Sequence, residues 1–402
     1  MKILIITPRI PYPPYRGDKL KIFNISRILS KTNDVHIVTF YRNESDKELV
    51  KPIEELGIKV SLVRLTLLES IFNALLAIFL TTPFQVAWYK SSRMKKSVED
   101  LLKQNSFDVV YYHLIRSSQY LSKIQDKSCL NIIDFTDAVS LYLSRMFEQE
   151  KNYIKKIFIR TELKRIKNYE NIAEKFDALF ICSEIDRQFL IDKGIKQDIQ
   201  ILNNGIDTDY FVSEQNDYDF KRIIFTGNMP YYANSDAVIY FTKDILPLIT
   251  KKDPEVRFYI VGQHPPLMIK KLASENVIVT GYVKDIRAEY LKSAVNVAPM
   301  RFGAGTLNKV LESIALGIPV VATSISMLGL PKELAKFVFI ADTPAEFANT
   351  VLEVINNPSI RNELMVEGKT IISKTLSWNN IVSDFEFFLK NKLKEKNRSL
   401  NV

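Results

Sequence analysis

Short, continuous apolar runs rich in valine and isoleucine recur along the whole chain, and stretches with helical spacing of apolar residues lie between them. Strands that are covered on both faces give such continuous runs, because neither face meets water. The runs that fit are Ile3–Ile6, Val35–Phe40, Val60–Leu65, Val109–His113, Asn131–Phe135, Ala178–Cys182, Gln200–Leu202, Arg222–Thr226, Arg257–Val261, Val277–Thr280, Val295–Met300, Pro319–Ala322 and Phe337–Ile340. Helical patterns include Lys19–Ser30, Ser92–Gln104 and a long one from about Asp137 to Lys175. This alternation predicts an α/β protein with doubly wound parallel sheets.

The length of the chain predicts two such sheets. It has 402 residues, more than one ordinary domain contains. The polar, turn-rich segment Leu202–Phe220 is the best candidate for the link between them. We therefore expect one Rossmann-like domain at 1–203, completed by a C-terminal helix at about 376–395, and a second one at 204–375. The basic end of the chain, Leu389–Leu400, reads as a frayed helix terminus.

Composition excludes several functional classes. The chain is 47% hydrophobic and 25% charged, which is typical of a globular protein. Its net charge of +9 would suit nucleic acid, but no nucleic-acid-binding module is recognisable and the aromatic residues do not interleave with the basic runs. Two cysteines and three histidines without zinc spacing predict a reduced, cytoplasmic setting and no metal site.

Two segments bear on membrane contact. The most apolar stretch, Ile71–Leu80, is too short to span a bilayer, and it predicts a core helix, with an interfacial helix as the alternative. Lys151–Lys167 holds seven basic residues and one acid. With the lysines of the C-terminal tail, this run suggests peripheral contact with the anionic inner face of the cell membrane, and the alternative is a solvated face.

The stretch "RFGAGTLNKVLESIALGIPVVAT", Arg301–Thr323, holds the densest group of candidate site residues. Helical spacing places Leu307, Val310, Leu311, Ile314 and Ala315 on one arc and Asn308, Lys309, Glu312 and Ser313 on the other. Gly317 and Pro319 would end the helix. Thr306 would cap its N-terminus, and Gly303 and Gly305 would let a phosphate approach the helix dipole. Glu312 would lie within reach of a sugar hydroxyl. The alternative is a surface helix with a solvated polar face.

Glycines that follow strands favour the second domain as the nucleotide-binding one. Gly227, Gly262 and Gly281 each stand directly after a predicted strand, where ligands of open α/β sheets bind. Tight turns are the alternative for any one of them. No G-x-G-x-x-G follows the first strand and no P-loop sequence occurs, which argues against the usual nicotinamide and P-loop enzymes.

Four fragments in the right order resemble the family-4 glycosyltransferases. They are the opening "PRIPYPPYRGDKLKIFNISRILSKTNDVHIVTF", "ILNNGIDTDYF", "IIFTGNMPYYANSDAVIYF" and the segment from "VTGYVKDIRAEYLKSAVNVAPM" to "GIPVVAT". The last is similar to a donor-binding core of the form G-x-G-T-x-x-K-x-L-E-x-x-x-x-G-x-P-V-V. The resemblance implies the GT-B architecture, two facing Rossmann-like domains with a cleft between them. It also implies retaining transfer from a nucleotide-sugar donor, with no cofactor or required metal, in bacterial surface polysaccharide or glycoconjugate synthesis.

The resemblance also implies roles for individual residues. The donor would be held by Gly17, Gly227, Asn228, Gly303, Gly305, Thr306, Asn308, Lys309 and Glu312, with Glu312 on the ribose. Lys309 and Arg301 would neutralise the departing phosphates, and His113 matches a cleft residue of several members. On the acceptor side stand Asp18, Arg116 and Asp137, with Asp134 near the same strand end. Asp18 and Asp137 have N-cap roles as alternatives, and His113 a purely structural one.

Two departures from the family pattern keep other functions open. The first carboxylate of the family's Glu-x7-Glu pair is replaced by Ala304, and the basic pair after the second domain's first strand is replaced by "TGNMPYYANSD". A catalytically degenerate GT-B binding subunit is therefore one alternative. A GT-B nucleotide-sugar epimerase or hydrolase is another, although the chain offers few carboxylates and histidines for its acid–base chemistry.

Overall fold

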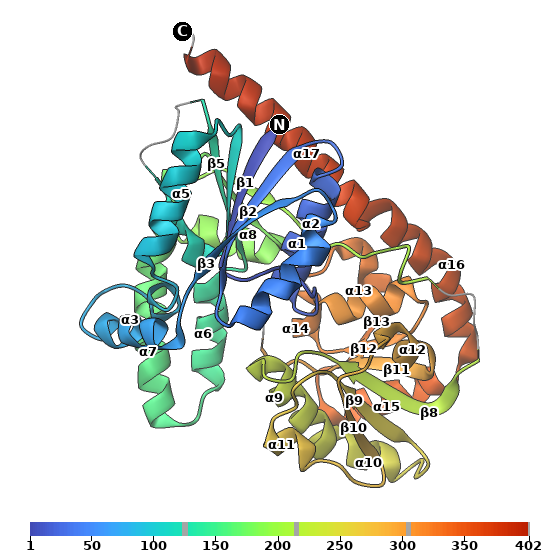
Figure 1. The fold of residues 1–402 in the computed structure, drawn as a ribbon. Helices are drawn as coiled ribbons and strands as arrows, with labels where there is room; N and C mark the ends of the chain where they lie inside the picture. Colours follow the sequence, from blue (N-terminus) through green and yellow to red (C-terminus); the bar gives the residue numbers. More distant parts are fainter. Residues whose placement is uncertain (123–127, 213–216, 303–306, 401–402) are drawn as a thin grey trace. The chain divides into compact units, whose positions relative to one another are not determined.

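The computed structural model describes residues 1–122, 128–212, 217–302 and 307–400, and within these ranges the chain divides into two compact units (Figure 1). Unit 1 comprises Met1–Asn203 and Trp378–Val402, and unit 2 comprises Asn204–Ser377. Each unit is one parallel sheet with helices connecting its strands, so the predicted pair of doubly wound α/β sheets is confirmed.

Unit 1 holds a seven-stranded sheet in the order β3-β2-β1-β4-β5-β6-β7. The strands are β1 (Lys2–Thr7), β2 (Asp34–Tyr41), β3 (Lys59–Arg64), β4 (Val109–His113), β5 (Leu130–Thr136), β6 (Ala178–Ile181) and β7 (Ile199–Ile201). The helices are α1 (Gly17–Leu29), α2 (Lys51–Glu54), α3 (Leu67–Ala77), α4 (Phe84–Ala87), α5 (Ser92–Gln104), α6 (Val139–Gln149), α7 (Tyr153–Tyr169), α8 (Glu184–Asp192) and α17 (Trp378–Leu400).

Unit 2 holds a six-stranded sheet in the order β10-β9-β8-β11-β12-β13. The strands are β8 (Asp219–Thr226), β9 (Arg257–Val261), β10 (Val277–Gly281), β11 (Ser293–Ala298), β12 (Val320–Ala322) and β13 (Val338–Ile340). The helices are α9 (Tyr232–Tyr240), α10 (Leu246–Thr250), α11 (Leu267–Lys270), α12 (Ile286–Leu291), α13 (Asn308–Ala315), α14 (Ser324–Met327), α15 (Pro344–Ile355) and α16 (Pro358–Thr375).

Every predicted strand is present, and the inner strands of each sheet are largely buried on both faces, as their continuous apolar runs indicate. The central strand β4, for example, is buried at all five positions. Gly317 ends α13 with φ of +72°, as expected of a residue just beyond a helix C-terminus.

Two helix predictions are wrong in extent. The single helix expected from about Asp137 to Lys175 is two helices, because Asn152 caps α7 by accepting the Lys155 N–H at 3.1 Å. The C-terminal tail is not frayed, since α17 continues to Leu400. Lys396 holds it there by donating to Asp177 and to the Cys129 carbonyl at 2.8 Å.

Candidate active site

Each sheet reverses its strand order at one point of its own, and candidate residues of that unit lie at the reversal. In unit 2 the strands on either side of the reversal are β8 and β11. Gly227 follows β8 and Arg301 follows β11, both at carboxyl ends. In unit 1 the flanking strands are β1 and β4, and His113 is the last residue of β4. Ligands of open α/β sheets bind at such switch points.

Lys309 lies on α13 with its charged end buried. Its Nζ donates to Asn234 Oδ1 at 2.9 Å and lies 3.6 Å from the centroid of the Phe225 ring. Burial lowers the pKa of Lys309 to about 7, against the partial compensation of Glu312 nearby. Glu312 thus offsets only part of the cost of burying the Lys309 ammonium group. A second anion beside Lys309 would raise its pKa again and favour the charged form.

Glu312 lies on the same helix and is partly buried. Its Oε2 accepts a hydrogen bond from the Tyr290 hydroxyl at 2.8 Å. The Tyr290 hydroxyl also contacts Thr226 Oγ1, at the end of β8. Burial raises the pKa of Glu312, while Tyr290 and Lys309 oppose that shift. The carboxylate is therefore fixed in position with its second oxygen available to a ligand hydroxyl.

The alternative of a solvated polar face on this helix is wrong. Lys309 and Ser313 are buried, and Asn296 of β11 holds both turns in place. The Asn296 side-chain amide donates to the Lys309 carbonyl at 3.1 Å and to Ser313 Oγ at 2.8 Å. Asn308, at the first position of the helix, accepts from Asn204 Nδ2 at 3.1 Å. The polar arc is thus anchored to the sheet beneath it.

Arg301 is already paired. Its Nε donates to Asp236 Oδ2 at 2.9 Å, and a second bond joins its guanidinium to Oδ1 of the same carboxylate. About half of the Arg301 side chain remains exposed. Arg301 would therefore have to share or exchange this partner to neutralise a phosphate.

Asn234 and Asp236 are the residues that the sequence reasoning left out of the site. Asn234 joins Lys309 to the loop after β8, where its Nδ2 donates to the Asn228 carbonyl at 3.0 Å. A Cβ at Gly227 would lie 2.8 Å from the Asn234 amide nitrogen, so glycine is required there by packing. Both residues belong to the "N-x-D" of the quoted "NMPYYANSD", which was the available signal.

The other strand-end glycines serve the fold. A Cβ at Gly262 would collide with the Gly227 carbonyl oxygen, which explains a glycine at the end of β9. Gly281 closes β10 with φ of +73°. Gly303, Gly305, Thr306 and Ala304 lie outside the described residues, so the predicted phosphate-binding roles stay predictions. The predicted cap at Thr306 is wrong, because the capping position of α13 is Leu307.

His113 stands at the switch point of unit 1. Its Nδ1 lies 3.0 Å from Thr7 Oγ1, at the end of β1, and its buried Nε2 has no hydrogen-bond partner among the described residues. Burial lowers the pKa of His113 to about 4, although Asp134 and Asp18 favour its charged form. The ring is thus neutral near pH 7. The next residue, Leu114, has φ of +67°, a strained conformation typical of functional sites.

Asp18 lies close enough to His113 to favour its charged form, and it is itself paired with two arginines. Asp18 pairs with Arg9 and, at 3.2 Å, with Arg16. Burial would raise its pKa, but these arginines together with His113 and Arg116 lower it to about 2. Asp18 is not the helix cap, because α1 begins at Gly17 and its capping residue is Arg16.

Arg116 lies on a short 3₁₀ helix, Ile115–Tyr120, and its guanidinium stacks 5.3 Å from the Tyr89 ring centroid. Arg9 contacts the same ring at 5.6 Å and was not singled out from the sequence. A Cβ at Gly17 would meet no described atom, so the start of α1 is open. Unit 1 therefore offers a basic, partly buried group at its switch point.

Two aspartates lie at the carboxyl end of β5, Asp134 within the strand and Asp137 just after it. Asp134 is fully buried, pairs with Lys21 Nζ at 2.8 Å and accepts from the Tyr111 hydroxyl, so it cannot reach an acceptor hydroxyl. Asp137 is not the cap of α6, since that position is Ala138. It accepts from the Cys182 thiol at 3.2 Å, and burial beside Asp186 raises its pKa to about 7.

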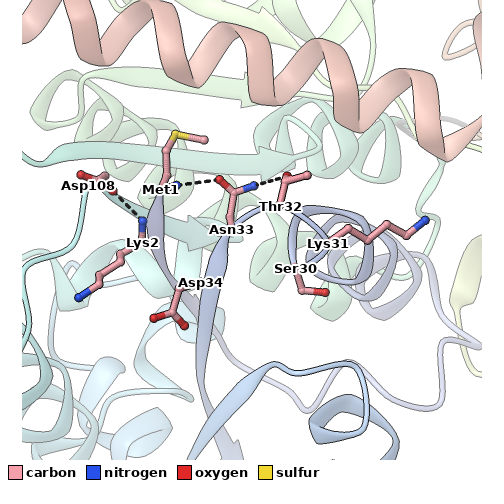
Figure 2. Close-up of a pocket in the computed structure, with 8 residues that line it drawn as sticks. All are labelled: Met1, Lys2, Ser30, Lys31, Thr32, Asn33, Asp34 and Asp108. Carbon is pink, nitrogen blue, oxygen red and sulfur yellow. Dashed lines mark hydrogen bonds between the residues drawn. The ribbon is translucent and has the colours of Figure 1, made fainter.

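A depression of about 580 Å³ lies at the amino ends of the unit 1 strands, opposite the carboxyl ends where His113 stands (Figure 2). It is lined by Met1, Lys2, Ser30, Lys31, Thr32, Asn33, Asp34 and Asp108. Figure 2 shows its polar groups bonded to one another: the N-terminus donates to Asn33 at 3.0 Å and the Lys2 N–H to Asp108 at 2.6 Å. Because it lies at the amino ends of β1 and β2, it is not the candidate active site.

Sequence comparison places unit 2 in a known family. Residues 220–357 match the family model of the group 1 glycosyl transferases. The matched range includes Gly227, Asn234, Arg301, Lys309 and Glu312. Unit 2 is a group 1 glycosyltransferase domain. The chain is also 24% identical over 402 residues to an uncharacterized 44.6 kDa protein in the cps region of Klebsiella pneumoniae, covering 95% of this chain and 98% of that one.

Solved structures show the fold of the entire chain. HepE of Anabaena, in complex with UDP and glucose, superposes with a TM-score of 0.67 at 14% identity, over 97% of this chain and 99% of that one. Sucrose-phosphate synthase of Thermosynechococcus elongatus gives a TM-score of 0.71 at 11% identity, over 97% and 98%. S. aureus TarM gives 0.68 at 12%, over 96% and 99%. The chain has the GT-B fold, as the sequence predicts.

Proposed function

We propose that this protein is a retaining, metal-independent glycosyltransferase that moves a sugar from a nucleotide-sugar donor to a glycan or lipid-linked acceptor. The observation that carries the proposal is the pair Lys309 and Glu312 on α13, a buried cation and a partly buried carboxylate fixed at the switch point of a group 1 domain. A nucleoside diphosphate presents phosphates to the first and ribose hydroxyls to the second. The cps-region relative suggests surface polysaccharide synthesis in the cytoplasm as the setting.

In the proposed reaction, the bond between the sugar's anomeric carbon and the phosphate oxygen breaks as a bond to the acceptor oxygen forms on the same face. The acceptor proton passes to the departing phosphate. Lys309 stabilises the negative charge that grows on that phosphate, because it is preorganised in a site of low dielectric. Arg301 adds a second cation when it exchanges part of its Asp236 pairing. Gly227, Asn228 and Asn308, with Gly303, Gly305 and Thr306 of the neighbouring loop, complete the donor contacts.

The unit 1 group is assigned to the acceptor and the donor phosphates. Neutral His113 can hydrogen-bond a sugar hydroxyl through its unpartnered Nε2 without introducing a charge. Asp18 and Arg116 supply a carboxylate and a guanidinium beside it, and Gly17 leaves space for the ligand. Asp137, with its raised pKa, would act as a hydrogen-bond donor rather than as an anion. A binding subunit without turnover is the main alternative, since Ala304 replaces a family carboxylate.

Donor binding is tested by a thermal-shift screen of UDP, GDP, ADP, CMP and their common sugars, with EDTA and again with magnesium. UDP compounds come first, because HepE is solved with UDP-glucose. A ligand at about 100 times its Kd should add roughly 2.7 kcal/mol to the free energy of unfolding, a shift of several degrees. We expect one nucleotide series to stabilise the protein equally in EDTA. Stabilisation that requires magnesium would refute metal independence, and no stabilisation would favour the binding subunit.

Replacing Glu312 by alanine should weaken nucleotide binding. The carboxylate holds a hydroxyl by a charged hydrogen bond, worth about 1.5–3 kcal/mol, so affinity should fall roughly 10- to 100-fold. Isothermal titration with the nucleotide found in the screen measures this. Glu353→Ala, an exposed glutamate of the same unit, is the matched control. Unchanged affinity of the Glu312→Ala protein would remove this residue from the donor site.

A further inference from the structure

Helix α3 shows the reverse of the usual surface-helix pattern, in which apolar side chains face the protein and polar ones face water. Its small and polar side chains face the protein, with Ser70 and Ala77 buried and Asn73 donating to the Lys90 carbonyl at 2.8 Å. Its large apolar side chains, and those of the turn that follows, face outward. Those exposed are Leu67, Leu68, Ile71, Phe72, Leu75, Leu76, Ile78, Phe79 and Leu80, with Leu68 at 79% and Phe79 at 87% exposure. The core helix expected at Ile71–Leu80 is therefore wrong, because these apolar side chains are exposed and no described residue of unit 1 covers this face.

The first two turns of α7 extend the apolar surface. Tyr153, Ile154, Ile157 and Phe158 are each at least half exposed. Figure 1 shows α3 beside α7, and two contacts link α7 to the segment that runs from the end of α3 to the start of α4. Arg165 donates to the Ile78 carbonyl at 3.1 Å, and the Phe158 ring stacks on Phe84 at 5.3 Å between centroids. We name the exposed apolar side chains of 67–80 and 153–158 the α3–α7 patch. They make up 13 of the 30 large apolar side chains that are exposed among the described residues.

The patch is bordered by positive charge. Residues 151–167 contain seven basic side chains and one acid. Lys151, Lys155, Arg160, Lys164 and Lys167 are exposed. The acid, Glu162, is buried and accepts the backbone N–H of Phe84 at 3.1 Å, so it does not neutralise the surface. Glu69 of α3 is paired with Arg93. An apolar surface with a cationic border is the combination that binds anionic interfaces.

We propose that the α3–α7 patch docks unit 1 onto the surface of an anionic lipid bilayer. The apolar side chains of α3 would enter the headgroup boundary while the α7 cations lie among the lipid phosphates. Within the part of the chain that the structure describes, no helix is both long and apolar enough to cross a bilayer, so this contact is interfacial. A second copy of the chain fits less well, because a two-fold interface would bring like-charged α7 helices together. This inference does not depend on the proposed transfer reaction.

Vesicle co-sedimentation of the full-length protein tests the proposal. Vesicles of phosphatidylglycerol and phosphatidylcholine should bind it, and pure phosphatidylcholine should bind it much less. Phe72→Ser/Phe79→Ser should weaken binding roughly tenfold or more, because it removes the inserted area. Lys155→Gln/Arg160→Gln should weaken it about fivefold per cation removed, and 0.5 M salt should reproduce that loss.

The control variants change exposed apolar and basic side chains of unit 2 instead. Leu267→Ser/Met268→Ser removes two exposed apolar side chains of α11, and Lys270→Gln/Lys271→Gln removes two exposed cations. Both should bind vesicles like the unmodified protein. The patch variants should keep their melting temperature and their nucleotide-induced shift, which separates loss of docking from failure of the donor site. Vesicle binding unaffected by the Phe72/Phe79 change would overturn the proposal, as would an α3-dependent dimer that ignores vesicles.

Discussion

Replacing Lys309 by methionine should lower kcat/KM by about 100- to 1,000-fold while leaving the protein as stable as before or more so. The activity loss follows from removing a preorganised cation beside the departing phosphate, where one such group contributes about 10² to 10³. Stability should rise by about 1–3 kcal/mol, because methionine fills a similar volume without the cost of a buried ammonium group. Release of nucleoside diphosphate from the donor found by thermal shift, together with the melting temperature, measures both effects.

Measuring stability and nucleotide affinity against pH separates the effect of the Lys309 charge from the effect of its side-chain volume. In the folded protein Lys309 releases its proton near pH 7, whereas in the unfolded chain it does so near 10.5. The unfolded state therefore binds more protons between these values, so stability should rise with pH across that window. Lys309→Met should flatten the rise. Nucleotide affinity should fall above pH 7 in the unmodified protein alone. Lys292→Met, at a largely exposed lysine of unit 2, is the matched control. A variant with normal turnover would contradict the role of Lys309.

Lys21→Met should destabilise unit 1 by about 3–5 kcal/mol. Lys21 and Asp134 are both completely buried and lie 2.8 Å apart, so removing the cation leaves an unpaired carboxylate in the core. Both tryptophans of the chain, Trp88 and Trp378, belong to unit 1. Urea unfolding followed by tryptophan fluorescence therefore reports this unit alone.

Lys21→Met/Asp134→Leu should recover most of that loss, since no buried charge remains. Lys103→Met, at an exposed lysine of α5, should change little. Burial alone would raise the pKa of Asp134, but Lys21, His113 and Tyr111 lower it. The stabilising effect of the pair is therefore present above the ordinary aspartate pKa and is lost as the pH falls below it. A single Lys21→Met variant as stable as the control would show that the ion pair is not needed.

Some errors of the sequence reasoning share one cause. It took Asp134 for an acceptor contact and Ile71–Leu80 for a core helix, and it kept a solvated polar side of α13 as an alternative. The polarity of each residue was identified correctly from the sequence, but the residues that contact it in the fold were not. Asp134 lies beside Lys21, and Asn296 covers the polar side of α13. The Asn152 cap that divides the long helix was visible locally and was missed.

The sequence by itself determined the strands, the two doubly wound sheets and the glycosyltransferase signature, because continuous apolar runs and short motifs are local properties. Only the tertiary structure decided which groups meet. Lys309 and Asn234 are 75 residues apart, and Thr7 and His113 are 106 apart. The same holds for α3, whose apolar face is plain in the sequence. Apolar spacing specifies a face that prefers to leave water, but the fold decides whether the protein supplies a surface to cover it.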